Sequence, residues 1–171
     1  MKHHRILAAA VVLTSSLFAA GSAEAVTKFK TTLVAREEVP ALHSLGAGTF
    51  NGTLNDANNR LDWQLTFDKL VGNVTQAHIH FGQAGVNGGI MVFLCTNLGN
   101  GPVGTQTCPS AGGTISGALA AADVIGPTAQ GMTVGNFGPV VRALKQGVTY
   151  VNVHTDKFPG GEIRGQLKIV P

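Results

Sequence analysis

Apolar and polar residues alternate with a period of two along most of the chain after residue 25. The clearest alternation runs over residues 61–68, where one face would carry Leu61, Trp63, Leu65 and Phe67. Successive side chains of a β-strand point to opposite faces, so this pattern predicts a strand with one buried face. Residues 49–55 and 162–169 alternate in the same way. Residues 90–95 are apolar throughout, which predicts a central strand that is covered on both faces.

Segments rich in Gly, Asn and Pro separate the expected strands, at residues 55–58, 71–73, 86–89 and 158–161. Short strands spaced by about 8–15 residues are typical of antiparallel sandwiches and barrels. The sequence therefore predicts an all-β protein, an antiparallel Greek-key β-sandwich or barrel of about eight strands. One or two short helices are expected, over residues 116–125 and 138–147, with Gly147 ending the second.

The N-terminal residues have the pattern of an export signal. Met1–Arg5 is positively charged, Ile6–Ala20 is apolar, and Ala23–Ala25 matches the small-x-small pattern that signal peptidase cleaves. The apolar run is shorter than the roughly 20 residues of a membrane-spanning helix. We therefore expect residues 1–25 to be a signal peptide and residues 26–171 to form a single domain. An uncleaved membrane anchor is the alternative.

Composition and charge exclude several classes of protein. The 171 residues include 23 Gly and only 12% charged residues, with a formal net charge of +3. The Lys and Arg residues are scattered, so nothing indicates nucleic-acid binding. An even number of cysteines in an exported protein predicts a disulfide between Cys95 and Cys108, with a pair of metal ligands as the alternative. Together with the signal, this predicts a secreted or periplasmic protein with no membrane span after cleavage.

Three histidines carry the main candidate chemistry. His78 and His80 lie two residues apart in the expected strand 74–82, so they share a face. In the expected strand 149–155, His154 likewise lies on the side opposite the core-facing residues. All three side chains are therefore expected on outward faces, and they would converge if the two strands pair. Three imidazoles suit copper or zinc, and hydrogen-bonding surface histidines are the alternative.

A metal site requires the ring nitrogens of the two strands to come within about 3–4 Å of one another. Copper is expected to be preferred over zinc, and affinity is expected to fall below the reference imidazole pKa of about 6.5. His43 is a weaker candidate for a fourth ligand. Residues on the same faces that would orient the ligands are Gln76, Asn152, Glu162 and Arg164.

Other interpretations of these polar residues stay open. Glu162 and Arg164 share a strand face, and an ion pair or cross-strand anchoring is the default interpretation of this spacing, with lining of the histidine site as the alternative. Glu37 and Glu38 are expected on solvated faces. The sequence has neither a Gly-x-Ser-x-Gly motif nor a P-loop, so no catalytic residue is predicted.

Three longer motifs resemble a known family. They are Glu37–Pro40 with Gly46–Phe50, Ala77–Gly82 with Gly88–Val92, and Tyr150–Thr155 with Phe158–Gln166. Together they resemble the opening, middle and close of the CHRD domain, the module first named from chordin, over about residues 28 to 169. The resemblance implies an extracellular β-sandwich. In chordin such domains belong to a secreted antagonist of bone morphogenetic proteins, but a shared module does not carry that function over.

Two departures from related patterns bear on the candidate site. His43 stands where the CHRD family usually has no histidine, which weakens it as a ligand. His78–Gly82 and Asn152–His154 are similar to the copper-binding strands of copper/zinc superoxide dismutase, but that enzyme's zinc-loop cluster and bridging histidine are absent from this sequence.

Two functional hypotheses follow. The first is a cell-envelope or extracellular binding module, with or without a transition-metal site, whose partner is an unidentified protein or ligand. The second is a small copper or zinc enzyme or metal carrier that uses the three histidines.

Overall fold

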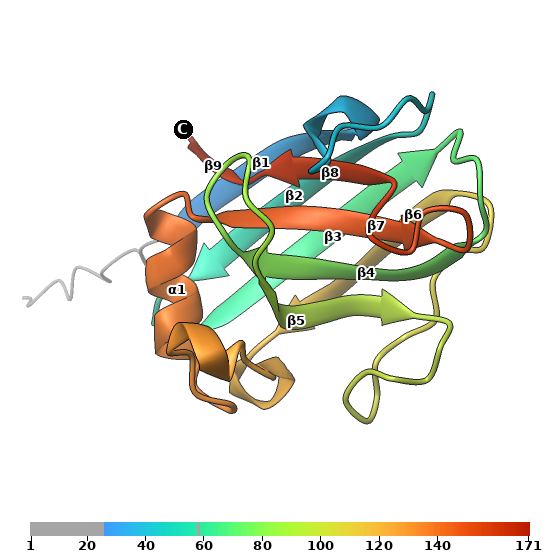
Figure 1. Ribbon diagram of the computed structural model, residues 1–171. Coiled ribbons are helices and arrows are strands. Elements are labelled where there is room, and N and C mark those ends of the chain that lie inside the picture. Colours follow the sequence, from blue (N-terminus) through green and yellow to red (C-terminus); the bar gives the residue numbers. More distant parts are fainter. Residues whose placement is uncertain (1–25, 58) are drawn as a thin grey trace, which may run out of the picture.

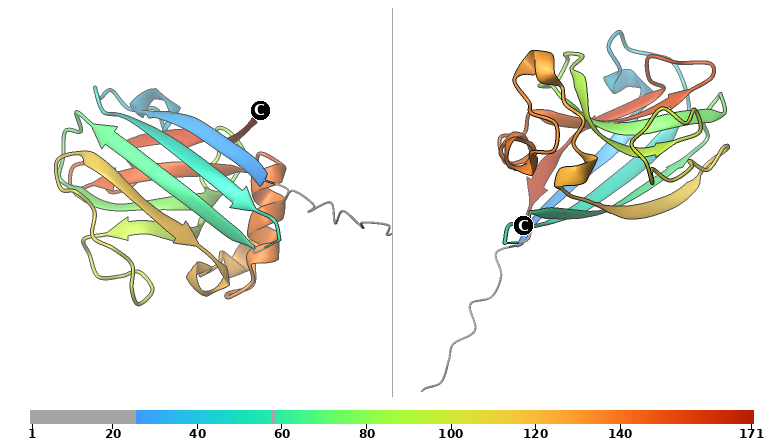
Figure 2. Two further views of the ribbon diagram at one scale, coloured as in Figure 1. Left: turned by 180° about the vertical axis from the view of Figure 1, so that it is seen from behind. Right: turned by 90° about the horizontal axis from the view of Figure 1, so that it is seen from below.

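The computed structural model describes residues 26–57 and 59–171, so the expected signal peptide lies outside the described residues. Nine strands form one antiparallel sheet that curls into a nearly closed barrel (Figure 1, Figure 2). Its strand order is β5-β4-β7-β8-β1-β2-β3-β6, with β9 beside β1. The strands are β1 (Val26–Val34), β2 (Ala47–Asn55), β3 (Arg60–Asp68), β4 (Val74–Phe81), β5 (Gly89–Thr96), β6 (Gly113–Leu119), β7 (Thr149–Thr155), β8 (Ile163–Gln166) and β9 (Lys168–Val170). The predicted all-β, antiparallel fold class is confirmed.

The inner face of the sheet encloses the apolar core. The alternation predicted for β3 is present, since its four core-facing residues are at most 5% exposed while Asp62 and Gln64 face solvent. From β4 and β7, Ile79 and Val151 point into the same core and are fully buried. The period-two pattern therefore identifies the core-facing side of each of these strands correctly.

Trp63 offers a direct test of this core. Its ring stacks near Phe50, with centroids 6.3 Å apart, and it closely approaches Gly117, where an added Cβ would lie 2.9 Å from Trp63 Cζ2. We expect Trp63→Phe to lower the free energy of unfolding by about 1–2 kcal/mol, because part of the buried ring is lost. Urea unfolding followed by circular dichroism measures this, with solvent-facing Gln64→Ala as the control. Equal stabilities for the two variants would contradict the burial of Trp63 in the core.

One of the two predicted helices is present. Helix α1 (Phe137–Lys145) falls within one residue of the expected start and covers one end of the barrel (Figure 1). Phe137, Val140 and Leu144 follow the helical period and are buried in the core. Gly147 has a left-handed φ of 69° just beyond the helix, which explains the termination predicted there.

The helix predicted over residues 116–125 is wrong. Strand β6 pairs residue by residue with β3, from Gly113 opposite Phe67 to Leu119 opposite Leu61. Only a 3-10 turn, η2 (Ala121–Asp123), follows it, while η1 (Ala35–Glu37) and η3 (Thr128–Gln130) are further short turns. The helical preference of the alanine-rich segment is overridden by pairing with the exposed edge of a long strand.

Strand β5 is covered as predicted, but it is not central. It lies at one end of the strand order, and β6 lies at the other. The loop after β5 covers it, held by the predicted Cys95–Cys108 disulfide, which is confirmed. Within this loop Gln106 Nε2 donates to the carbonyls of Leu94 (3.3 Å) and Ser116 (3.2 Å), so one side chain bridges the two ends of the sheet. A covered edge strand gives the same apolar pattern as a central one.

Candidate metal centre

The three histidines project from two neighbouring strands. β4 and β7 pair antiparallel, and their register places Gln76 opposite His154, His78 opposite Asn152, and His80 opposite Tyr150. Because side chains alternate along a strand, the three imidazoles share the face opposite the apolar core. The two strands thus pair, which is the condition under which the sequence predicts that the three imidazoles converge.

The three side chains lie on the predicted faces, but the alternative interpretation as surface histidines is wrong, because these faces are covered. His78, His80 and His154 are only 0%, 6% and 7% exposed. The β4–β5 loop folds back across β7, and the β7–β8 loop lies beside the opposite end of the strand pair (Figure 1). Period-two alternation reports which side of a strand a residue occupies, but it carries no information about loops that cover that side. The histidines thus belong to a second, polar buried layer.

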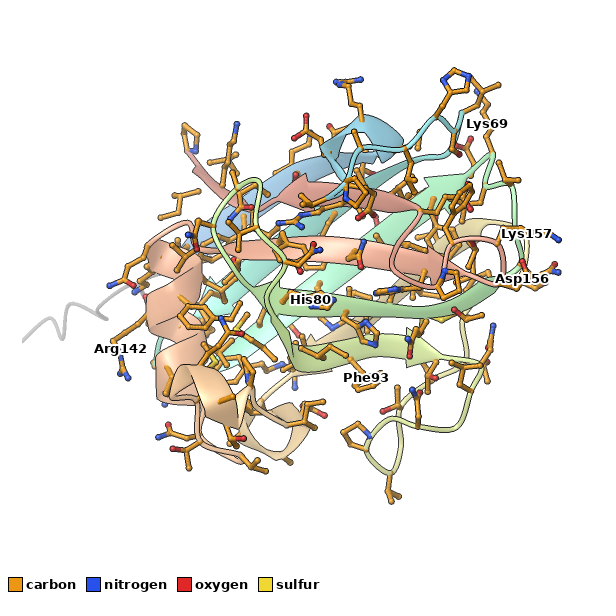
Figure 3. All side chains as sticks on the ribbon, in the orientation of Figure 1. Lys69, His80, Phe93, Arg142, Asp156 and Lys157 are labelled. Carbon is orange, nitrogen blue, oxygen red and sulfur yellow. A yellow bond between two sulfur atoms is a disulfide. The ribbon has the colours of Figure 1, made fainter. Side chains whose placement is uncertain are left out.

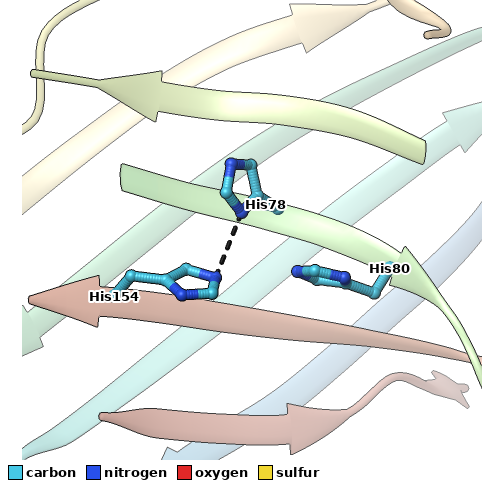
Figure 4. A group of neighbouring side chains, drawn as sticks. All are labelled: His78, His80 and His154. Carbon is cyan, nitrogen blue, oxygen red and sulfur yellow. Dashed lines mark hydrogen bonds between the residues drawn. The ribbon is translucent and has the colours of Figure 1, made fainter. Parts of the chain in front are cut away.

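The imidazole rings converge on a common point (Figure 4). His78 Nδ1 and His154 Nε2 are 3.2 Å apart, and one ring nitrogen from each of the three residues lies within 4.8 Å of the others. Two nitrogens bound to one ion at about 2.0–2.1 Å can be separated by at most about 4.2 Å. The closest pair already meets the expected spacing of about 3–4 Å, and the whole set is slightly wider than a closed coordination sphere.

Two main-chain carbonyls determine which nitrogens are available. His80 Nδ1 lies 3.0 Å from the carbonyl oxygen of Gly88, and His154 Nδ1 lies 2.8 Å from that of Pro159. A carbonyl can only accept, so each Nδ1 carries the proton and each Nε2 keeps its lone pair. Nε2 of His80 is buried without a hydrogen-bond partner, which is what a metal ion would satisfy. His78 meets His154 through Nδ1, so its own unpartnered Nε2 points away from the same ion and is not satisfied by it.

The environment also keeps the imidazoles neutral. Burial, followed by the neighbouring His154 and His80, lowers the pKa of His78 to about 2. Burial lowers the pKa of His80 to about 4, although its hydrogen bond to Gly88 acts in the opposite direction. Burial likewise lowers the pKa of His154. Neutral imidazole is the form that binds a metal, so the loss of metal affinity that the sequence predicts below about pH 6.5 is expected only at lower pH.

Tyr150 and Arg164 flank the site. The Tyr150 ring stacks on His80, with centroids 4.7 Å apart and planes 4° apart, and the Arg164 guanidinium carbon lies 3.4 Å from the Tyr150 centroid. Arg164 also donates to the Asn87 side chain (2.9 Å) and to the Val86 carbonyl. Arg164 therefore anchors the β4–β5 loop over the histidine face.

The remaining polar residues proposed from the sequence hold other parts of the structure. Asn152 Nδ2 donates to Glu38 Oε1 (2.6 Å), and Gln76 Oε1 accepts from Asn100 Nδ2 (3.0 Å) in the loop after β5. Glu162 is fully buried and accepts four hydrogen bonds from loop residues and β7. Within the described ranges it forms no ion pair with Arg164, so these two residues act as separate anchors.

Two further predictions about polar residues have clear outcomes. His43 is exposed and does not belong to the histidine group. Glu38 was expected on a solvated face, but only 7% of it is exposed, because Asn152 and the β7–β8 loop enclose it. A sequence pattern could not indicate the contributions of Gly88 and Pro159, since both act through backbone carbonyls.

Comparison with known proteins identifies the family. The architecture is an antiparallel, nearly closed β-barrel with a disulfide and a buried histidine group. The family model of the CHRD domain matches residues 29–167, so the chain belongs to the CHRD domain family. CHRD domains are extracellular interaction domains, and the match leaves the partner unspecified. No curated protein gives a significant match, and no solved structure does. None of the described helices is long and apolar enough to cross a membrane.

Proposed function

We propose that this chain is an exported CHRD-domain protein that binds one copper ion through His78, His80 and His154 and acts as an extracellular or periplasmic interaction module. The convergence of three neutral imidazoles in a buried layer is the observation that carries the proposal. Hydrogen bonds from His80 and His154 to backbone carbonyls support it, because they orient the ring lone pairs toward the common point.

The donor set favours copper over zinc. All three donors are imidazole nitrogens, which bind both metals, and the Irving–Williams order then gives Cu²⁺ the higher affinity. Zinc is the alternative occupant. The hypothesis of a small copper or zinc enzyme uses the same ligands, and its similarity to superoxide dismutase rests only on these short strand motifs.

Copper titration of the metal-free protein tests the site. We expect one equivalent of copper to bind, with zinc binding more weakly. His78→Gln, His80→Gln and His154→Gln should each weaken copper affinity by at least about tenfold, since even residues that only orient a ligand contribute this much. Circular dichroism verifies that each variant folds. His43→Ala removes an exposed histidine and should leave affinity unchanged.

Two results would overturn the metal assignment. One is the absence of stoichiometric copper binding by the folded protein. The other is copper binding that persists unchanged in all three glutamine variants, which would place the ion elsewhere.

Export is tested separately. The confirmed disulfide supports an oxidising compartment. We expect protein collected from the periplasm or medium to begin at Val26 and to contain no alkylatable thiol before reduction. Mass spectrometry of the intact protein measures both. Retention of Met1 in a membrane fraction would indicate an uncleaved anchor instead.

A further inference from the structure

A pocket of about 270 Å³ opens beside the polar buried layer, between the segment after η1 and the β7–β8 loop. Its wall is formed mainly by the apolar side chains of Val39, Pro40, Leu42, Phe158 and Pro159. The carboxyl group of Glu38 is the acidic group that lines it. The other charged residue of the lining, Lys157, is exposed and lies at the outer edge of the molecule (Figure 3). The pocket therefore combines an apolar wall with one acidic residue, and its one basic residue is the exposed Lys157.

Glu38 has an unused acceptor in this pocket. Its side chain is more than nine-tenths buried, and Oε1 accepts the hydrogen bond from Asn152. Among the described residues Oε2 has no hydrogen-bond partner, and Glu38 forms no ion pair. Gly161 packs so closely that an added Cβ would lie 2.7 Å from Glu38 Oε1, which holds the carboxyl group in place. This oxygen is not among the fully enclosed side-chain atoms that lack a partner, so it keeps some accessible surface from which a donor can approach it.

The charges around Glu38 are consistent with a missing cationic partner. Burial raises the pKa of Glu38 to about 7, while Arg164 and the hydrogen bond from Asn152 act to lower it. Arg164 is already engaged by Asn87, Val86 and the Tyr150 ring, so its guanidinium is not free to pair with Glu38. A cation that entered the pocket would find an acidic group without a direct counterion.

We propose that this pocket receives a lysine side chain of a partner protein, with the ammonium group on the free Glu38 oxygen and the aliphatic stem against the apolar wall. Lysine fits better than arginine, because only one carboxyl oxygen is available and a bidentate guanidinium pair needs two. The long methylene stem of lysine suits a wall of Val, Leu, Pro and Phe side chains. This inference deepens the interaction-module part of the proposed function and does not depend on a bound metal.

Nuclear magnetic resonance titration tests the pocket. The probe is Nα-acetyl-lysine methylamide, added at pH 8 to ¹⁵N-labelled protein in EDTA, so that Glu38 is ionised and no metal interferes. We expect saturable shifts of the Val39 and Gly161 amides and none at distant Gly131. The matched norleucine derivative has the same stem without the charge. It should bind about tenfold more weakly, as expected for loss of a hydrogen bond between charged groups.

The variant Glu38→Gln separates charge from shape. It keeps an acceptor for Asn152. It should lower the affinity for the lysine probe by about the same factor of ten and leave the affinity for the norleucine derivative unchanged. Equal binding of the two probes, an unchanged affinity in Glu38→Gln, or shifts located away from the pocket would each overturn the inference. Because the titration is done without metal, its failure leaves the copper result unaffected.

Discussion

Replacing Glu162 with alanine is expected to lower the free energy of unfolding by about 4 kcal/mol. Glu162 is fully buried and immediately precedes β8. Its Oε1 accepts from Ser44 Oγ (2.7 Å) and the Val71 amide (2.6 Å), and its Oε2 accepts from Thr155 Oγ1 (2.8 Å) and the Gly72 amide (3.3 Å). Alanine would leave these donors without a partner, and each unsatisfied buried group costs about 1–3 kcal/mol.

The isosteric change Glu162→Gln distinguishes this network from simple loss of volume. The glutamine amide nitrogen is itself a donor, so in either orientation of the amide group it would face donors of the neighbouring residues. We therefore expect Glu162→Gln to lose a substantial part of the stability although it fills the same space. Exposed Glu37→Gln is the control, and urea unfolding measures all three variants. A loss below about 1 kcal/mol for Glu162→Ala would contradict the anchoring role.

Acidification of metal-free protein from pH 6.5 to pH 5 is expected to destabilise the Glu38→Gln variant by about 3 kcal/mol. His78 and His80 resist protonation in the folded state, with pKa values of about 2 and about 4. The unfolded chain binds protons near the reference pKa of about 6.5, so stability is full above that pH and is lost as the pH falls. The lowered pKa of His154 acts in the same direction.

In the unmodified protein, protonation of Glu38 changes the stability in the direction opposite to that of the histidines. Its pKa is raised to about 7, so the folded state takes up this proton more readily than the unfolded chain, and stability gains as the pH falls. We therefore expect the unmodified protein to lose only about half as much stability as Glu38→Gln over the same interval. Urea unfolding at several pH values in EDTA measures both slopes. Parallel slopes would contradict the shifted pKa of Glu38, and a flat slope in Glu38→Gln would contradict neutral, buried histidines.

The sequence predicts strand faces well because they depend on local alternation. Trp63 and Ile79 point into the core as expected, and His78, His80 and His154 share a face as expected. The prediction of a helix over residues 116–125 is wrong because the conformation of this segment depends on pairing with β3, which is distant in the chain.

The period-two alternation does not predict which loops cover a given face of the sheet. The histidine layer is enclosed by loops whose positions depend on long-range contacts, such as that of Arg164 with Asn87 and that of Asn152 with Glu38. The backbone carbonyls of Gly88 and Pro159 leave no trace in side-chain chemistry. Burial of the site, its neutral charge state and the pocket at Glu38 therefore required the folded structure.

Anomalous diffraction at the copper absorption edge tests the central claim most directly. Crystals of the protein loaded with one equivalent of copper should show a single strong anomalous peak among His78, His80 and His154. Metal–nitrogen distances of about 2.0–2.1 Å are expected to all three residues. A peak at any other position, or no peak among these histidines in copper-loaded crystals, would contradict the account.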